Sequence, residues 1–491
     1  MSAAGSVKPL AKLVGNPNPT KIVCTIGPAT ESEEMIGQLI EAGMDVVRLN
    51  FSHGDHETHR RSIERVRKVS REKGCQIAIL ADLQGPKIRL GKLEGGEPVT
   101  LIRGETVIID VEAEVGTSDR LSTTYPELAH DVSAGKRVMI QDGLVELRVL
   151  RTTETEVVCE IIHGGSVRQH AGINLPDVRV SSPTMTEKDR EDLEFAIEQG
   201  ADYIALSFVR SADDIRLIRQ EIEDLGADIP VVAKLEKPEA LEELEEIVDE
   251  TDVVMVARGD LGVETSPAEV PVLQKRIILE CSRQRDPVIT ATQMLESMTD
   301  NPRPTRAEAS DVANAVLDAT DAVMLSGETA IGKYPVEAVE TMRAIASVAE
   351  KELRSGDASS AAPLVGMDFL DFADAVSRAA AETAELVDAK VIVAFTQSGS
   401  TARLVSKCRP RMPIIAATPL PATARRCSLY WGVQPLLIAM IDDTDDMIED
   451  IDRQLRELEI CEDGDVIVIT AGTPIGERGT TNTMKVHVVG S

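Results

Sequence analysis

Aromatic residues and lysine are both scarce in this chain. Aromatic side chains make up 2% of the 491 residues, and the 52 basic residues comprise 17 Lys and 35 Arg. The 83 acidic residues outnumber them and give a formal net charge of −31. This surplus opposes general affinity for nucleic acid or anionic lipid, because both need a basic surface. We interpret the dispersed acidity as adaptation to high salt; an ordinary acidic cytosolic protein is the alternative.

Long apolar runs and clustered cysteines are missing as well. No apolar run approaches the ~18 residues that a membrane-spanning helix needs, and the first 20 residues lack the apolar stretch of a secretory signal. We therefore expect a cytoplasmic protein. The seven cysteines form neither a CxxC motif nor a short Cys/His cluster, which argues against a structural zinc site and a disulfide framework.

Short β-branched apolar runs alternate with amphipathic stretches over much of the chain. Eight of the runs are expected to be parallel strands, because most are apolar throughout rather than alternating. They span 21–26, 45–50, 76–82, 203–208, 231–235, 253–257, 288–292 and 322–325. Amphipathic stretches such as 33–41, 57–73, 188–199 and 306–317 lie between them. Eight strand-then-helix units predict an α/β fold, a (β/α)₈ barrel.

Two further regions break this rhythm. Residues 91–182 are rich in strand signal, and we interpret them as a β-domain inserted in a barrel loop, the position expected of a lid. Residues 355–363 resemble a linker, and five strand candidates after it predict a C-terminal open α/β domain. The expected division is a tail at 1–18, a barrel at 19–90 and 183–354, an inserted cap at 91–182 and a C-terminal domain at 355–491.

Polar residues gather at the C-terminal ends of the predicted barrel strands, where barrel enzymes have their active sites. These residues are Asn50, Ser52, His53, Asp82, Lys234, Glu236, Arg258, Asp260, Thr292, Ser326 and Glu328. Glu236 and Asp260, on neighbouring strands, can share one hard cation, since Mg²⁺ takes one or two protein carboxylates plus substrate oxygens. Lys234 lies on the same side of its strand as Glu236. A dication and an ammonium there would stabilise a developing oxyanion; a salt bridge without a metal is the alternative.

Several longer segments resemble the pyruvate kinase family. They are TKIVCTIGP at 20–28, VRLNFSHG at 47–54, VARGDLG at 256–262, ATQMLES at 291–297, PRPTRAE at 302–308 and MLSGET at 324–329. They occur in the family's order and spacing, and blocks of this length are far more specific than a lone glycine motif. The resemblance implies phosphoryl transfer from phosphoenolpyruvate to ADP, which gives pyruvate and ATP at the end of glycolysis, and it implies a homotetramer.

The resemblance also implies a role for individual residues. Glu236 and Asp260 would ligate Mg²⁺ or Mn²⁺, and Lys234 would stabilise charge at the transferring phosphoryl group and the enolate. The resemblance also implies that Arg48 contacts the phosphoryl group and that Thr292 and the amides of Gly259 and Asp260 contact the carboxylate. Thr292 and Ser326 would lie where the enol is protonated. The nucleotide side would be lined by Thr25, Pro28, Asn50, His53 and Arg89.

One departure from the family pattern bears on monovalent cations. Many members bind K⁺ and have Asp-Thr-Lys-Gly-Pro-Glu after the third strand, whereas this chain has Asp-Leu-Gln-Gly-Pro-Lys at 82–87. The ligands Asn50, Ser52 and Asp82 remain, but Leu83 replaces the hydroxyl. Because Lys87 can supply the charge that K⁺ brings, the pattern resembles the K⁺-independent branch, and we expect no specific K⁺ requirement.

A second departure lies in the predicted cap. The family often has a lysine directly before the Gly-x-Asn-Leu-Pro segment, where this chain has Ala171. Arg168 and His170 are nearby basic residues, but neither is assigned a catalytic role.

A candidate effector loop lies in the C-terminal domain. It follows a predicted strand and opens a predicted helix at 402–407, and it contains Thr396, Ser398, Gly399, Ser400 and Thr401. Its amides and hydroxyls predict an anion site at a helix N-terminus, where similar proteins bind a phosphorylated allosteric effector. Ordinary N-capping by Ser398 or Ser400 is the alternative.

Two other functions are consistent with parts of the sequence. A metal-dependent pyruvate-enolate aldolase or phosphoenolpyruvate mutase-like enzyme would keep the barrel and its carboxylate pair. It has no ADP to hold, so Arg48, His53 and Arg89 argue against it. A non-catalytic effector-binding protein would use only the C-terminal domain, and the intact carboxylate pair with Lys234 argues against that.

Overall fold

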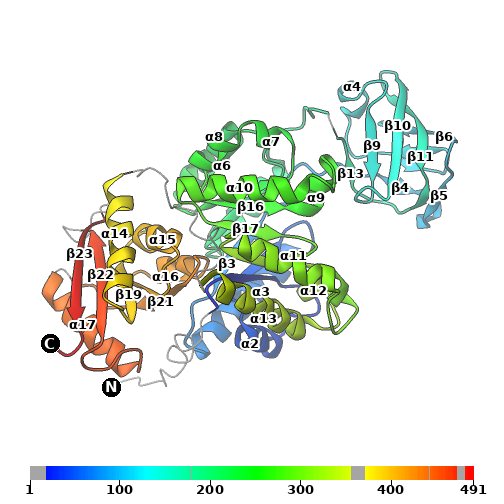
Figure 1. The fold of residues 1–491 in the computed structure, drawn as a ribbon. Coiled ribbons are helices and arrows are strands. Elements are labelled where there is room, and N and C mark those ends of the chain that lie inside the picture. Colours follow the sequence, from blue (N-terminus) through cyan, green and yellow to red (C-terminus); the bar gives the residue numbers. More distant parts are fainter. Residues whose placement is uncertain (1–17, 177, 355–370, 442, 473–480) are drawn as a thin grey trace.

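A closed barrel of eight parallel strands forms the centre of the molecule (Figure 1). The computed structural model describes residues 18–176, 178–354, 371–441, 443–472 and 481–491. The barrel strands are β1 (Lys21–Thr25), β2 (Val46–Asn50), β3 (Ala78–Asp82), β14 (Tyr203–Leu206), β15 (Val231–Leu235), β16 (Val253–Ala257), β17 (Val288–Ala291) and β18 (Ala322–Leu325). They follow one another around the ring in chain order, and β18 closes it against β1. The predicted barrel is therefore confirmed.

Amphipathic helices cover the outside of the barrel, each after its strand. They are α2 (Glu33–Ala42), α3 (His56–Glu72), α5 (Glu187–Glu198), α6 (Ala212–Asp224), α8 (Leu244–Glu250), α10 (Val270–Gln284), α11 (Arg306–Leu317) and α13 (Pro335–Arg354). Local capping sets their starts: Ser32 accepts from Met35 N before α2, and Thr305 with Glu308 forms a capping box before α11. Among the described helices, none is long and apolar enough to cross a membrane.

Short helical turns follow several strands at the C-terminal end of the barrel. They are α7 (Glu239–Glu242), α9 (Arg258–Glu264), the 3₁₀ turn η2 (Glu296–Thr299) and α12 (Gly327–Ala330). Each begins within a few residues of the end of β15, β16, β17 or β18. The chain therefore stays close to this end of the barrel before it turns back into the outer helices.

The chain between β3 and β14 folds into a separate cap of β-structure, as predicted. Figure 1 shows it standing off the barrel on the side of α7 and α9. Its main sheet has the order β13 (Ile173–Asn174), β9 (Arg137–Ile140), β10 (Val145–Thr152), β11 (Glu156–His163), β6 (Thr106–Asp110) and β8 (Arg120–Ser122). Smaller pairs join β12 (Gly165–Val167) to β5 (Val99–Leu101) and β4 (Lys92–Leu93) to β7 (Val115–Gly116), and α4 (Leu128–Asp131) lies between β8 and β9. The cap has its own buried apolar core.

The C-terminal domain is an open five-stranded sheet, also as predicted. Its order is β21 (Val433–Leu437), β20 (Ile414–Thr418), β19 (Val391–Phe395), β22 (Val466–Gly472) and β23 (Thr481–Val488), and β23 alone is antiparallel to its neighbour. Its helices are α14 (Phe372–Leu386), α15 (Ser400–Lys407), α16 (Pro421–Cys427) and α17 (Thr444–Glu457). The predicted linker at 355–363 lies outside the described residues.

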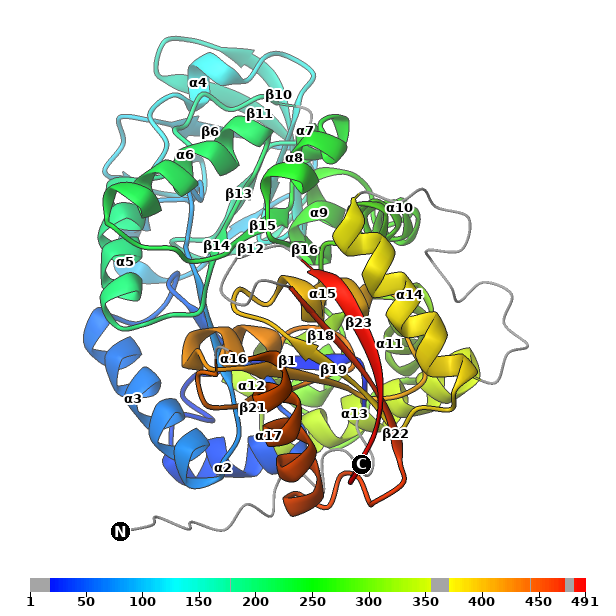
Figure 2. The same ribbon diagram turned by 90° about the vertical axis from the view of Figure 1, so that its left-hand side faces the viewer.

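This domain contacts the barrel at the N-terminal ends of its strands, and Figure 2 is viewed from this side, with the C-terminal sheet in front of the barrel. Ion pairs cross the boundary: the partly buried Arg425 Nε lies 2.8 Å from Asp202 Oδ1, and the buried Lys407 Nζ lies 2.9 Å from Asp321 Oδ2. One apolar cluster also includes side chains from both the barrel interior and the C-terminal sheet. The C-terminal domain thus covers one end of the barrel and leaves the other end facing the cap.

Candidate active site

Lys234 lies in a buried polar cluster at the C-terminal ends of β3, β14 and β15. Its Nζ is 2.9 Å from Glu236 Oε1 and 3.2 Å from Asp82 Oδ1, and it donates a hydrogen bond of 2.6 Å to Ser207 Oγ. Parallel register explains the meeting, because strands β3, β14 and β15 are neighbours that end at the same level. Lys234 and Glu236 share one side of the chain, as their spacing predicts.

Opposing charges determine the protonation states in this cluster. Burial alone would lower the pKa of Lys234, but the carboxylates of Asp82 and Glu236 outweigh burial and raise that pKa. Burial would raise the pKa of Asp82, yet Lys234 and Arg48 hold it below its ordinary value. At neutral pH the site therefore contains a fixed ammonium and a fixed carboxylate.

Arg48 on β2 is a second cation at this end of the barrel. Its Nη2 lies 2.6 Å from Asp82 Oδ2, and its Nη1 donates a hydrogen bond of 3.1 Å to Thr25 Oγ1. Thr25 in turn donates to the Leu325 carbonyl at 3.0 Å, across the closing pair of β1 and β18. The guanidinium is thus oriented by the strands on both sides before a ligand binds.

Glu236 and Asp260 present the oxygen donors that a divalent cation prefers. Burial raises the pKa of Glu236, and the charge of Asp260 adds to the rise although Lys234 opposes it. A cation bound to both carboxylates would remove that repulsion. Among the residues that the structure describes, no group of three or more His, Cys, Asp or Glu could hold a metal. Two carboxylates fit Mg²⁺ or Mn²⁺, because these ions take one or two protein carboxylates and complete their coordination with water or substrate oxygens.

The α9 N-terminus and the residue after β17 form a second polar contact beside Asp260. Gly259 N donates to Thr292 Oγ1 at 2.7 Å, and Thr292 has a left-handed φ of 66°. Arg258 holds this turn, because its Nη2 donates to the Thr292 carbonyl at 2.8 Å and its Nη1 lies 2.7 Å from Asp311 Oδ2. Arg258 is therefore engaged in structural contacts.

Ser326 and Glu328 follow β18 at the same end. Glu328 is buried, and it accepts hydrogen bonds from Ser326 N at 2.7 Å and from Leu295 N at 3.0 Å. The Ser326 Oγ is buried and has no hydrogen-bond partner in the structure. A buried hydroxyl without a hydrogen-bond partner is energetically costly unless a ligand or a water molecule provides that partner. The Ser326 hydroxyl can therefore bind an ordered water molecule in this site.

The residues predicted for the monovalent site lie around the same end of β2 and β3. Asn50 Oδ1 accepts a hydrogen bond from Ser52 N at 3.1 Å, and Leu83 is buried. Lys87 Nζ lies 4.0 Å from Asp260 Oδ1, and both side chains are about a quarter exposed. The ammonium of Lys87 is therefore beside a candidate metal ligand.

The predicted nucleotide side is more open. Pro28 is exposed, and Arg89 Nη1 donates to the His170 carbonyl of the cap at 3.2 Å. Burial lowers the pKa of His53, and the nearby charges of Arg89, Lys87 and Arg48 lower it further. His53 is thus neutral at pH 7 in a locally positive region, which is the electrostatic setting that a polyphosphate needs.

Sequence reasoning missed two residues of this site. Ser207 binds Lys234, and the backbone N–H of Phe208 donates to Glu236 Oε2 at 2.9 Å. Both directly follow β14, the fourth barrel strand, for which the sequence offered no charged residue to single out. Both positions satisfy the strand-end rule, but the hydroxyl of Ser207 was not singled out, and Phe208 takes part through its backbone N–H, which no residue type signals.

The candidate effector loop leads into α15, which begins two residues earlier than predicted. Gly399 adopts φ 95°, and its N–H donates to Thr396 Oγ1 at 2.8 Å. Thr401 Oγ1 lies 2.8 Å from Thr481 Oγ1. The N-cap residue of α15 is Gly399, which has no side chain to cap the helix. Ser398 Oγ accepts from Ser400 N at 3.4 Å within the turn.

Comparisons with known proteins agree along nearly the whole chain. The family model "Pyruvate kinase, barrel domain" matches residues 18–339, and "Pyruvate kinase, alpha/beta domain" matches residues 374–487. The pyruvate kinase of Staphylococcus aureus strain MRSA252 is 49% identical over 478 residues, which is 96% of this chain and 80% of that protein; strain USA300 gives the same figures. A crystal structure of a Cryptosporidium parvum pyruvate kinase superimposes with a TM-score of 0.90 at 36% identity and covers 99% of this chain and 100% of that one.

Proposed function

The chain belongs to the pyruvate kinase family and transfers a phosphoryl group from phosphoenolpyruvate to ADP, and we propose that the Lys234 cluster is where this transfer occurs. The observation that carries the proposal is the buried ammonium of Lys234, held between Asp82, Glu236 and Ser207. A coupled assay of ATP formed from phosphoenolpyruvate and ADP with Mg²⁺ in molar salt tests it. The family assignment removes the aldolase, mutase and non-catalytic alternatives.

The roles we assign follow the charge of the reactants. Arg48 binds the phosphoryl group of the substrate. The substrate carboxylate is held by Thr292 and by the backbone amides of Gly259 and Asp260. Lys234 stabilises the charge on the enolate oxygen, which carries the phosphoryl group before transfer. Phosphoryl transfer leaves a protein little to do beyond positioning and charge neutralisation, and these preorganised groups provide both. Glu236 and Asp260 hold Mg²⁺ or Mn²⁺, which supplies positive charge next to the substrate oxygens when bound. Thr25, Pro28, Asn50, His53 and Arg89 line the nucleotide side.

Ser326 acts in the second half of the reaction, the protonation of enolpyruvate. Its unpartnered buried Oγ supports this role, because it can order the water that delivers the proton. We expect Ser326→Ala to slow exchange of the pyruvate methyl protons with D₂O, followed by NMR, by about a hundredfold, a typical contribution of a positioned proton donor. Phosphoenolpyruvate binding should change little.

Ser377→Ala provides the matched control for this variant. Ser377 on α14 is also buried with an unpartnered Oγ, but it lies in the C-terminal domain. An equal loss of exchange in both variants would point to a general loss of packing and would contradict the assigned role of Ser326.

The enzyme should show little specific activation by K⁺. The ammonium of Lys87, 4.0 Å from Asp260 Oδ1, is a tethered positive charge beside the proposed site and supports a charge supply that needs no diffusible cation. We expect similar rates in KCl, NaCl and tetramethylammonium chloride at matched ionic strength. A many-fold advantage of KCl would contradict this proposal.

We further propose a salt-adapted homotetramer. The dispersed net charge of −31 supports the first property, since screened carboxylates keep the protein hydrated without strong self-repulsion. Exposed apolar side chains on the edge strand β23, such as Val486 and Val488, and on α14, such as Phe372 and Leu386, support burial against other copies. Light scattering should give a four-chain mass in molar KCl, and the unfolding midpoint should rise from low to molar KCl.

The loop from Thr396 to Thr401 is proposed to bind a phosphorylated allosteric effector. Its support is the left-handed Gly399, which opens the α15 N-terminus as an N-cap residue without a capping side chain. Titration of sugar phosphates against the wild type and Thr401→Val tests it, and equal affinity in both would contradict it.

A further inference from the structure

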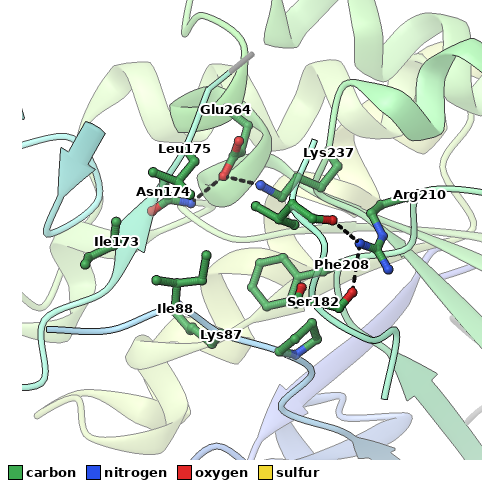
Figure 3. A pocket seen from close by; sticks show the side chains of 12 residues that line it. Lys87, Ile88, Ile173, Asn174, Leu175, Ser182, Phe208, Arg210, Lys237 and Glu264 are labelled. Atoms are coloured by element: carbon green, nitrogen blue, oxygen red, sulfur yellow. Dashed lines mark hydrogen bonds and ion pairs between the residues drawn. The ribbon is translucent and has the colours of Figure 1, made fainter. Parts of the chain in front are cut away.

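Three polar side chains meet in a narrow pocket where the cap joins the barrel (Figure 3). The Glu264 Oε1 accepts hydrogen bonds from Asn174 Nδ2 at 2.9 Å and from Lys237 Nζ at 2.8 Å. We refer to Lys237, Glu264 and Asn174 as the junction cluster. Figure 3 shows Lys237 and Asn174 pointing toward the Glu264 carboxylate from opposite sides.

The junction cluster is almost fully buried. The Glu264 side chain is 2% exposed and that of Lys237 is 8% exposed. Two charges taken out of water at a boundary between domains are expensive unless they hold each other in a defined geometry. A pair in this place therefore specifies one arrangement of the segments that carry it.

Those segments are the ones that carry the proposed metal ligands. Lys237 directly follows Glu236, and Glu264 ends α9, the short helix that contains Asp260. Asn174 belongs to β13, the strand that precedes the return of the chain from the cap to the barrel. One carboxylate thus connects the two ligand-bearing segments to each other and to the cap.

A second set of contacts also joins the segment around Glu236 to the cap. The Phe208 N–H donates to Glu236 Oε2 at 2.9 Å. Two residues later, Arg210 Nη1 donates to the carbonyls of Val180 at 2.9 Å and Ser182 at 3.1 Å, which lie on the returning chain of the cap. The same pocket is lined by Phe208 and Arg210. The returning chain is therefore held by the neighbours of Glu236 as well.

We propose that Lys237 and Glu264 are positioning residues that set the spacing of Glu236 and Asp260 and couple it to the position of the cap through Asn174. The inference rests on the proposed metal site and adds a mechanical link to it. A divalent ion that bound both carboxylates would act on the two segments that the junction cluster joins to β13. When the cluster is broken, the metal site is less well formed and the cap no longer responds to the metal.

The first test measures Mn²⁺ affinity by EPR of the free ion, with the full chain. The double variant Lys237→Met/Glu264→Gln removes both charges together, so no buried charge remains unpaired and folding is preserved. We expect its Kd for Mn²⁺ to rise at least about tenfold, as for other residues that orient metal ligands. The single variant Lys237→Met should also weaken Mn²⁺ binding. Lys237→Arg, which keeps the ion pair with Glu264, should retain most of the wild-type affinity for Mn²⁺. A double variant with wild-type affinity would overturn the proposal.

Arg179 and Glu242 provide the matched control. They also join the segment between β13 and α5 to the barrel, at 3.3 Å, but their side chains are 83% and 69% exposed. Exposed pairs contribute little, so Arg179→Gln/Glu242→Gln should leave the Kd for Mn²⁺ unchanged. A matching loss in this control would show that any contact between cap and barrel suffices, and it would contradict the specific role of the junction cluster.

The second test follows the coupling by hydrogen exchange and mass spectrometry. We expect Mn²⁺ to slow amide exchange in the peptide that contains β13 in the wild type and not in the double variant. Equal slowing in both, or none in the wild type despite bound Mn²⁺, would overturn the coupling. A wild type that binds no Mn²⁺ at all would instead contradict the proposed metal site, so the two failures are distinguishable.

Discussion

Lys234→Met is expected to lower the rate of phosphoryl transfer by several orders of magnitude and to leave phosphoenolpyruvate binding largely intact. The ammonium is buried between Asp82 and Glu236, so it is positioned for charge that develops during transfer. Interactions that strengthen in the transition state change kcat more than binding. A loss of about a thousandfold corresponds to about 4 kcal/mol of transition-state stabilisation. The coupled assay gives kcat, and titration with Mg²⁺ present gives substrate affinity.

Lys407→Met is the matched control for this prediction. Lys407 is equally buried and pairs with Asp321 at 2.9 Å, but it lies at the opposite end of the barrel, at the C-terminal domain. Removal of Lys234 leaves the buried Glu236 without its cation, and removal of Lys407 takes away one of the two cations that pair with the buried Asp321, the other being Arg409. Both changes lower the free energy of unfolding. The control should therefore lose stability with kcat largely unchanged. A loss of less than tenfold in Lys234→Met would contradict the assigned role.

The barrel could be predicted from the sequence because its signals are local. The runs at 231–235, 253–257 and 322–325 coincide with β15, β16 and β18, since each is a short buried strand with a helix on either side. The cap was predicted as a strand-rich insertion, and its longer strands, such as β9 and β10, have a local signal of their own, whereas its shortest strands do not. Its strands β4, β7 and β13 are two residues long, and they form only because distant segments pair with them.

For the candidate site, the sequence predicted which residues at neighbouring strand ends lie close together, but not the contacts made by the cap. The residues that Lys234 and Arg48 contact on β3 and β15 follow from the rule that parallel strands end together. The junction cluster did not follow, because Asn174 and Glu264 are 90 positions apart and meet only once the cap is folded. Phe208 was missed for a different reason: its left-handed φ of 58° is unusual for an aromatic residue, and no residue type in the segment signals it.

Glu236→Gln is expected to abolish metal-dependent activity and to weaken Mn²⁺ binding below detection by EPR. The substitution keeps the size of the side chain, and its amide oxygen can still accept from Phe208 N. The substitution removes the negative charge that repels Asp260 in the free site and that would bind the cation in the loaded site. Raising the Mg²⁺ concentration should not restore the rate, because the remaining carboxylate, Asp260, is about a quarter exposed and acts alone.

Comparison of this variant with Lys234→Met separates the two parts of the site. Lys234→Met should bind Mn²⁺ at least as well as the wild type, since it loses a positive charge 2.9 Å from Glu236, whereas Glu236→Gln should not bind it. Glu350→Gln is the control for Glu236→Gln, because Glu350 is a buried carboxylate that accepts from Trp431 Nε1 at 2.7 Å far from the strand ends of the site. If Glu236→Gln retained wild-type Mn²⁺ affinity, Glu236 would be only the partner of Lys234, and the cation would have to be held elsewhere.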